Sequence, residues 1–202
     1  MKIASIVIFF CVGVFTAFAQ EETLINGPIE NGGFGGPVLK VGSFNGEVAI
    51  LVGGRGGWII NHSFIIGGGG YGLVNNVKAK VLGPYGERYL NFGYGGLELE
   101  YVSESHRLIN FSFQTLIGAG GLSWRDPDVR TGMRDSDSDT FFMVEPGVNV
   151  TLNVTKYFRM SGGVSYRFIS GVQSPASSDP DLSGPSGVFD FPIWQVLGIS
   201  HV

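Results

Sequence analysis

The side chains with the greatest capacity for chemistry are charged residues at alternate positions of strand-like stretches. The candidates are Lys40, Glu47, Arg55, Glu98, Glu100, Glu145, Arg159 and Arg167. Successive residues of a β-strand point to opposite faces, so Glu145 shares a face with Asn149 while Val144 faces the other way. Charges in an enclosed space are tolerable only when they are paired and hydrogen-bonded. The pattern therefore predicts a buried network of ion pairs or, as the alternative, a path for protons and small ions.

The elements that position these residues are stretches with a period of two. They are 34–43, 47–60, 63–75, 88–101, 107–121, 141–153, 157–171 and 188–201. In the fifth stretch, Phe111 and Phe113 oppose the polar Ser112. Strands of globular proteins are commonly about five or six residues long, and these longer ones suit a tilted crossing of a hydrocarbon layer. Because a soluble barrel or sandwich shows the same period, the period alone leaves that alternative open.

The connections between the stretches are short and long in turn. Phe44-Asn45-Gly46 is a tight hairpin signal, and 61–62, 102–106 and 154–156 are also short. Residues 76–87, 122–140 and 172–187 are long and rich in Gly, Pro, Asp and Ser. This predicts an all-β fold, a closed antiparallel up-and-down transmembrane β-barrel of eight strands, with the short turns in the periplasm and the long loops outside.

The predicted topology sorts the charged candidates by depth. Lys40, Glu47, Glu145 and Arg167 fall in the outer half of the lumen, and Arg55, Glu98, Glu100 and Arg159 fall in the inner half. Each half then holds two basic and two acidic groups. Eight strands enclose a space that side chains can fill. We therefore expect a lumen plugged by its own ion pairs.

The N-terminal residues indicate export to the cell envelope. Residues 1–19 have a positive start, an apolar run and an Ala17-Phe18-Ala19 cleavage pattern, which predicts a signal peptide. Residues 20–32 are expected to be a flexible periplasmic lead-in, and residues 33–202 the barrel. The single cysteine, Cys11, lies in the signal peptide. A net charge of −4 and a pI near 5.3 oppose nucleic-acid binding.

Two further groups of residues could carry chemistry. Asp135, Asp137 and Asp139 resemble the start of a calcium loop, but the turn glycine and the closing glutamate are missing, so we expect no cofactor and treat these aspartates only as candidates for a divalent cation. The histidines His62, His106 and His201 each lie beside a serine. The topology places all three at the periplasmic rim, away from the outer-leaflet lipid that an acyl hydrolase would need to reach.

The chain resembles the small eight-stranded outer-membrane barrels of the OmpA and OmpX type. The glycine-rich stretch 53–62, followed by Gly67-Gly68-Gly69-Gly70-Tyr71-Gly72, is also similar to uncharacterised barrels of the Bacteroidetes. The resemblance covers residues 33–202 as architecture. One departure is the C-terminus, which ends in Val202 where such barrels usually end in an aromatic residue.

These features predict a monomeric cell outer-membrane protein with a structural or adhesive role. Its expected partners are outer-membrane lipids and lipopolysaccharide, contacted through the belt and the loops. The alternatives are a soluble or periplasmic barrel that binds a small apolar ligand and, third, a lipid-modifying enzyme.

Overall fold

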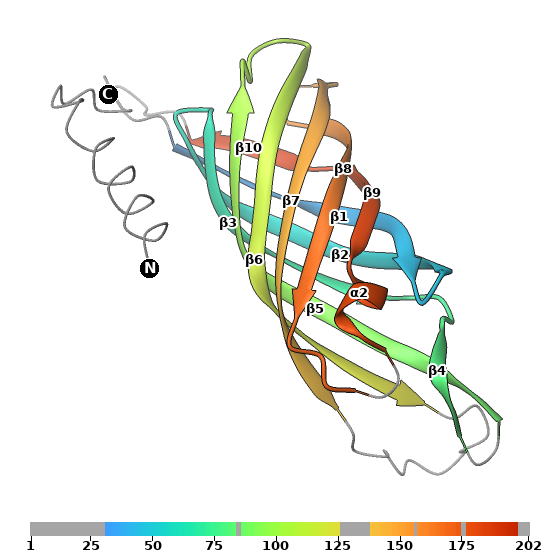
Figure 1. Cartoon of the computed structure of the whole chain (residues 1–202). Helices are drawn as coiled ribbons and strands as arrows, with labels where there is room; N and C mark the ends of the chain where they lie inside the picture. Colours follow the sequence, from blue (N-terminus) through green and yellow to red (C-terminus); the bar gives the residue numbers. More distant parts are fainter. Residues whose placement is uncertain (1–30, 84–85, 126–137, 156, 175–176, 198–202) are drawn as a thin grey trace, which may run out of the picture.

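In the computed structural model, strand pairing closes on itself to form a barrel (Figure 1). The structure describes residues 31–83, 86–125, 138–155, 157–174 and 177–197. Its strands are β1 (Asn31–Phe44), β2 (Glu47–Ile60), β3 (Phe64–Leu73), β4 (Lys78–Gly83), β5 (Gly86–Ser103), β6 (Ile109–Arg125), β7 (Asp139–Asn153), β8 (Arg159–Ser170), β9 (Gly184–Asp190) and β10 (Ile193–Leu197), and a short helix α2 spans Asp179–Leu182. The order β10-β1-β2-β3-β5-β6-β7-β8-β9, with an added β1–β9 pairing, confirms the predicted closed antiparallel barrel of eight strands.

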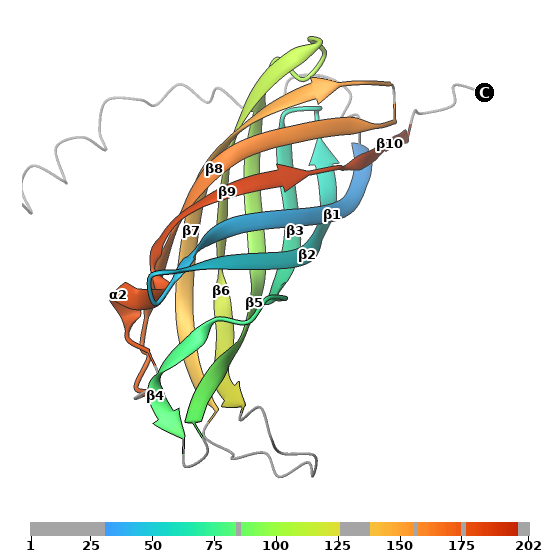
Figure 2. The ribbon, with the colours of Figure 1, turned by 90° about the vertical axis from the view of Figure 1, so that its right-hand side faces the viewer.

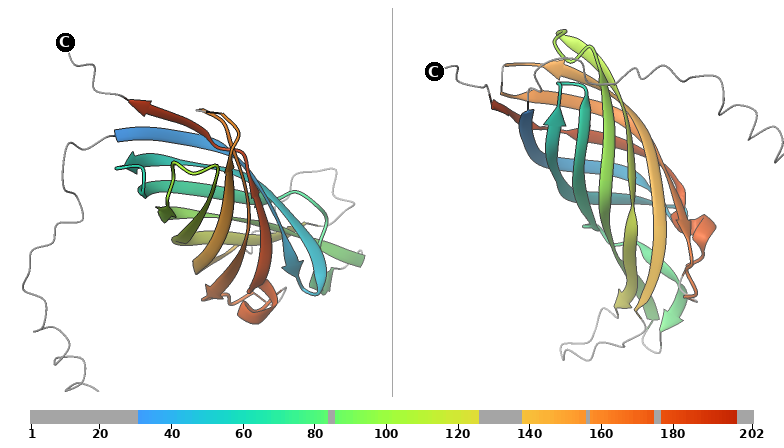
Figure 3. Two further views of the ribbon diagram at one scale, coloured as in Figure 1. Left: turned by 90° about the horizontal axis from the view of Figure 1, so that it is seen from above. Right: turned by 90° about the vertical axis from the view of Figure 1, so that its left-hand side faces the viewer.

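The strands are strongly staggered around the barrel. A circuit of paired residues that leaves β1 at Asn31 returns to β1 at Val41, a stagger of ten residues. Such a stagger requires the strands to tilt against the barrel axis, as Figures 2 and 3 show. The loops gather at one end, here called the loop end. The turns after β2, β5 and β7 lie at the other, the short-turn end.

Three details differ from the expected strand plan. The eighth strand starts at Gly184 and not at Val188, and it consists of β9 and β10 separated at Phe191 and Pro192. Proline has no backbone N–H to give to a ladder, which accounts for the break. The segments 76–87 and 172–187, expected to be loops, contain β4 and α2. The predicted signal peptide, the lead-in as far as residue 30 and the C-terminal residues 198–202 lie outside the described residues.

The first turn follows its sequence signal closely. Asn45 and Gly46 both have positive φ, 52° and 82°, as a two-residue hairpin turn requires. This connection lies at the loop end. It also places the side chain and the backbone of Asn45 where the later loop segments contact them.

The barrel is apolar outside and polar inside. Phe111 and Phe113 of β6 are 55% and 58% exposed, whereas Ser112 between them is fully buried. The same alternation exposes large side chains on every wall strand, including Val52, Trp58, Ile66, Leu97, Val150, Val164, Phe168 and Phe189. Soluble proteins rarely expose apolar surface on this scale, whereas a lipid-facing barrel requires it. Within the described residues, no helix is long and apolar enough to cross a membrane.

Glycines allow the sheet to bend sharply at the wall formed by β2, β3, β5 and β6. Gly118 of β6 lies so close to β5 that a Cβ atom added there would be 2.1 Å from the carbonyl oxygen of Gly95. That oxygen belongs to the backbone and cannot move aside easily. By contrast, a Cβ on Gly72 of β3 would meet no atom within 4 Å.

We predict that Gly118→Ala destabilises the barrel and that Gly72→Ala, its matched control, does not. Overpacking of this kind typically costs about 1–3 kcal/mol. The free energy of unfolding of each variant, refolded in lipid vesicles, can be measured by urea titration. Heat-modifiable mobility on a gel gives the folded fraction. Equal stability of the two variants would contradict the close approach between β5 and β6.

Candidate functional site: the filled lumen and its capped end

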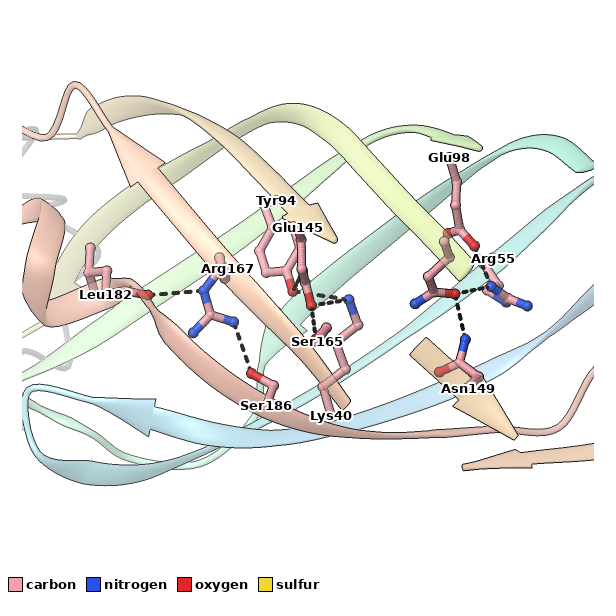
Figure 4. A network of polar contacts seen from close by, with 11 residues as sticks. Lys40, Arg55, Tyr94, Glu98, Glu145, Asn149, Ser165, Arg167, Leu182 and Ser186 are labelled. Atoms are coloured by element: carbon pink, nitrogen blue, oxygen red, sulfur yellow. Dashed lines mark hydrogen bonds and ion pairs between the residues drawn. The ribbon is translucent and has the colours of Figure 1, made fainter. Parts of the chain in front are cut away.

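The lumen holds a balanced set of buried charges. Among the described residues the buried cations are Lys40, Arg55, Arg159 and Arg167, and the buried anions are Glu98, Glu100, Glu145 and Asp190. Wall strands on all sides contribute them. Figure 4 shows that the charges are arranged along the barrel as successive clusters.

The first cluster is centred on Arg55 of β2. Its Nη2 atom lies 2.9 Å from Glu100 Oε2, its Nε atom lies 2.7 Å from Asp190 Oδ2, and its Nη1 atom pairs with Glu98. Nη1 also donates to Gln114 Oε1 at 2.6 Å. One guanidinium thus binds three carboxylates, and its delocalised charge and rigid fork of donors suit it to this role.

The second cluster joins Lys40 of β1 to Glu145 of β7. Lys40 Nζ lies 2.9 Å from Glu145 Oε1 and 3.7 Å from the centre of the Tyr71 ring. Glu145 also accepts hydrogen bonds from Tyr94 OH at 2.8 Å and from Ser165 Oγ at 2.6 Å. Both charged side chains are only 1% exposed, so every polar contact they make is with protein.

The third cluster surrounds Arg167 of β8, nearest the loop end. Arg167 Nε donates to the carbonyl oxygen of Leu182 at 3.0 Å, and Nη1 lies 3.5 Å from Ser186 Oγ (Figure 4). Its Cζ atom lies 4.4 Å from the centre of the Phe44 ring. The guanidinium is therefore held by a backbone carbonyl and aromatic faces.

Apolar side chains close the lumen on both sides of the charges. At the short-turn end, Phe34, Ile59, Ile65 and Val102 form one buried cluster. Towards the loop end a larger cluster includes Phe44, Phe92, Phe141, Met143 and Leu182, and Phe92 stacks on Phe141 with ring centres 4.9 Å apart. The sequence-based expectation of a lumen plugged by its own ion pairs did not include these apolar layers.

A cap formed by Ser177–Ser183, which includes α2, lies over the loop end. Its Leu182 side chain is fully buried, and the carbonyl oxygen of Asp181 accepts a hydrogen bond from the backbone of Asn45 at 3.1 Å. Asp181 Oδ1 lies 2.5 Å from Lys80 Nζ of β4. The cap therefore connects the eighth strand to the first hairpin and to β4. Hydrogen bonds from Lys80 and then Ser178 hold the pKa of Asp181 below its usual value.

The structure brings most of the predicted charges together but corrects two expectations. Glu47 lies at the rim of the loop end, where its Oε2 accepts a hydrogen bond from the backbone of Lys78, so it does not join the buried charges. Asp190 takes a place in the Arg55 cluster that the sequence reasoning overlooked. Its signal was the alternation with Phe189 and Phe191, which puts Asp190 on the polar face. Arg159 is buried at the start of β8, as its position on that face predicts.

The other candidate residues do not assemble. Asp135, Asp137 and His201 lie outside the described residues. Asp139 accepts hydrogen bonds from the backbones of Thr140 and Gln173. No group of three or more His, Cys, Asp or Glu residues in the described part of the chain could hold a metal ion. His62 and His106 lie in turns at the short-turn end.

Comparison with known proteins identifies the fold. Neisserial surface protein A superposes with a TM-score of 0.52 at 12% identity, over 85% of this chain and 100% of its own. The N-terminal barrel domain of OprF from Pseudomonas aeruginosa gives a TM-score of 0.52 at 11% identity, over 83% of this chain and 99% of its own. The fold is that of a small outer-membrane β-barrel. No protein-family model and no curated sequence matches the chain.

We predict that Glu145→Gln strongly destabilises this outer-membrane barrel. The substitution leaves Lys40 charged and buried without its counter-ion, a change that typically costs about 3–5 kcal/mol. Replacing both partners, as Lys40→Met with Glu145→Met, should recover most of the loss because no unpaired charge remains. Urea unfolding in lipid vesicles gives the free energies.

The exposed pair of Lys78 and Glu87 provides the control. Both side chains are 50% exposed, so Glu87→Gln should leave the unfolding free energy almost unchanged. The interpretation fails if Glu145→Gln behaves like Glu87→Gln, or if the double variant is no more stable than the single one.

We also predict that the attachment of the cap is lost in acid. A carboxyl group with a depressed pKa stabilises the fold at neutral pH, and this contribution disappears as the pH falls through the folded-state pKa, here below about pH 4. The amide chemical shifts of residues 177–183, followed by NMR in micelles, should report this transition. Lys80→Ala removes the largest cause of the shift and should raise the midpoint; an unchanged midpoint would refute the role of Lys80.

Proposed function

We propose that this protein is a non-conducting barrel of the outer membrane whose loop end serves as a contact surface for molecules outside the cell. The observation that carries the proposal is a lumen crossed by buried ion pairs and by two apolar clusters, combined with a β-sheet that projects past the barrel on the loop side. A filled lumen offers no route for solutes. We therefore assign the function to the sheet that projects at the loop end.

The filled lumen argues against transport. A solute would have to displace two apolar clusters and three clusters of buried charges. Breaking a buried ion pair by removing one partner from the other is expensive, typically several kcal/mol. The proton or ion path that the sequence left open as an alternative finds little support in this packing, because the charges engage one another and aromatic rings close the loop side.

The projecting sheet supports a role in contact. β4 and the outer ends of β5 and β6 extend beyond the β1–β2 turn in both side views (Figures 1 and 2). β4 pairs with β5 alone among the described strands, and on its other edge the backbone of Lys78 is bonded only to the side chains of Asn45 and Glu47. Open strand edges are common sites for pairing with other chains. The charged side chains of Lys78 and Glu87 stand exposed on this sheet.

The outward apolar side chains favour lipid as the surroundings of the barrel wall. A soluble barrel with an apolar ligand would present the opposite arrangement, with polar residues outside and a cavity lined by apolar ones. The proposal therefore keeps outer-membrane lipids as partners of the belt and lipopolysaccharide as a neighbour of the loop rim.

We predict that the purified protein in planar lipid bilayers shows no discrete conductance steps. Truncation of the aromatic layer, as in Phe92→Ala with Phe141→Ala, should leave the closure by the charge clusters in place. Regular single-channel steps from the folded wild-type protein would overturn the non-conducting part of the proposal.

The contact role needs a separate test. Cells that display the protein should adhere to surfaces or to other cells more strongly than cells without it. Replacing residues 76–85 by a short Asn-Gly turn removes β4 and should abolish this gain while the barrel still folds, as judged by gel mobility. Undiminished adhesion by a folded variant without β4 would contradict the role of the projecting sheet.

A further inference from the structure

The buried guanidinium of Arg167 is only half used. Its Nε atom donates to the carbonyl oxygen of Leu182, while its Nη2 atom is buried and has no hydrogen-bond partner among the described residues. Nε and Nη2 lie on the same edge of a guanidinium and together form the fork that a carboxylate fills with two parallel hydrogen bonds. A single carbonyl oxygen occupies a fork built for two acceptors.

Arg167 also has no counter-ion of its own in the part of the chain that the structure describes. The nearest cluster contains Glu145, but that carboxylate already accepts from Lys40, Tyr94 and Ser165. Arg167 itself is fully buried. A buried cation without an anion is costly, which makes this position attractive to a negatively charged group.

The surroundings of the fork are mostly aromatic and apolar, with the ring of Tyr94 5.8 Å from Arg167 Cζ and Ser186 Oγ 3.5 Å from Nη1. The Phe44 ring lies 4.4 Å and the Phe92 ring 5.9 Å from Arg167 Cζ, and both belong to the same buried cluster as Leu182. The cap thus inserts an apolar side chain next to an oxygen acceptor. Leu182 therefore presents an apolar side chain and a polar oxygen, as a small amphiphilic molecule would, but its carbonyl oxygen carries no negative charge.

The cap has the features of a segment that can move aside. It does not pair with a strand, and Gly184, which follows it directly, has a φ of 154° that few other residues adopt. Its hydrogen bonds to β8 and the residues after it are few: Asp179 accepts from the backbones of Gly171 and Val172, and Ser183 Oγ from that of Ile169. Its ion pair with Lys80 is partly exposed, with the lysine side chain 52% exposed. Exposed pairs of this kind contribute little to stability.

We propose that the buried position next to Arg167, Phe44 and Phe92 is a binding site for a small carboxylate with an apolar body, and that Leu182 of the cap occupies it in the structure described. The ligand displaces Leu182: its carboxylate accepts from Nε and Nη2, and its apolar part takes the place of the leucine side chain. The proposal does not rest on the contact role proposed for β4, although Lys80 of β4 helps to hold the cap.

Binding of 3-phenylpropionate, compared with its neutral isostere 3-phenylpropanamide, tests the proposal. Isothermal titration of the refolded barrel in micelles should show saturable binding of the carboxylate with an affinity about tenfold or more above that of the amide, the ratio expected for charge-assisted hydrogen bonds. Leu182→Ala removes the apolar side chain of the internal competitor and should tighten carboxylate binding severalfold. Leu108→Ala, the same change at an exposed turn of the opposite end, should not.

Variants of the fork and of the cap attachment complete the test. Arg167→Gln should abolish the preference for the carboxylate over the amide. If that variant does not fold, Lys80→Ala, which frees the cap without touching the site, should tighten carboxylate binding as Leu182→Ala does. Equal affinities for carboxylate and amide, or no saturable binding to folded Leu182→Ala protein, would overturn the proposal.

Discussion

The rest of this structure depends on the neutralisation of charges that have no access to bulk water. A side chain that points into an eight-stranded barrel is surrounded by other side chains, and a lone charge there carries a large desolvation penalty. The buried cations and anions of the described residues balance only because Asp190 is present and Glu47 is not among them. Neutrality is therefore a property of the folded lumen and not of any one strand, because the paired groups come from β1, β2, β5, β7 and β9.

The apolar layers at both ends strengthen this arrangement. Phe34 and Ile59 on one side and Phe92 and Phe141 on the other keep water from the charges between them. Electrostatic attraction grows as the local dielectric falls, so the exclusion of water favours the ion pairs once they are complete and penalises any that are broken. The same reasoning explains why tyrosines border the Lys40 cluster: Tyr71 offers the ammonium group a ring face, and Tyr94 gives Glu145 a donor.

The sequence predicted the wall of the barrel better than its ends. Alternation in a strand such as β6 is a local property, and it identified the outward Phe113 and the inward Gln114 without knowledge of the neighbours. The ion-pair partners of Arg55 were harder to predict. Glu98, Glu100 and Asp190 lie next to Arg55 only because of the stagger of the closed sheet, and the sequence of a single strand does not reveal that stagger. The final strand was misjudged at Gly184 because a glycine-, proline- and serine-rich start looks like a loop. α2 has only four residues, too few to show a helical period, so its contact with Arg167 had no sequence signal.

The two ends of the barrel differ in what they can do, and the difference follows from how each is closed. At the short-turn end the closing residues, such as Ile59 and Val102, belong to wall strands, so they cannot withdraw without disrupting the sheet and its backbone hydrogen bonds. At the loop end the last closing residue, Leu182, belongs to a cap that lies outside the wall and meets it through hydrogen bonds with β8 and the residues that follow it, one hairpin turn and one partly exposed ion pair. A wall residue is fixed by the same hydrogen bonds that allow a barrel to exist in lipid, whereas a cap residue is fixed only by its own contacts. Both proposals therefore place recognition at the loop end, where the cap can exchange its own contacts for those of a ligand without breaking the strand pairing of the wall.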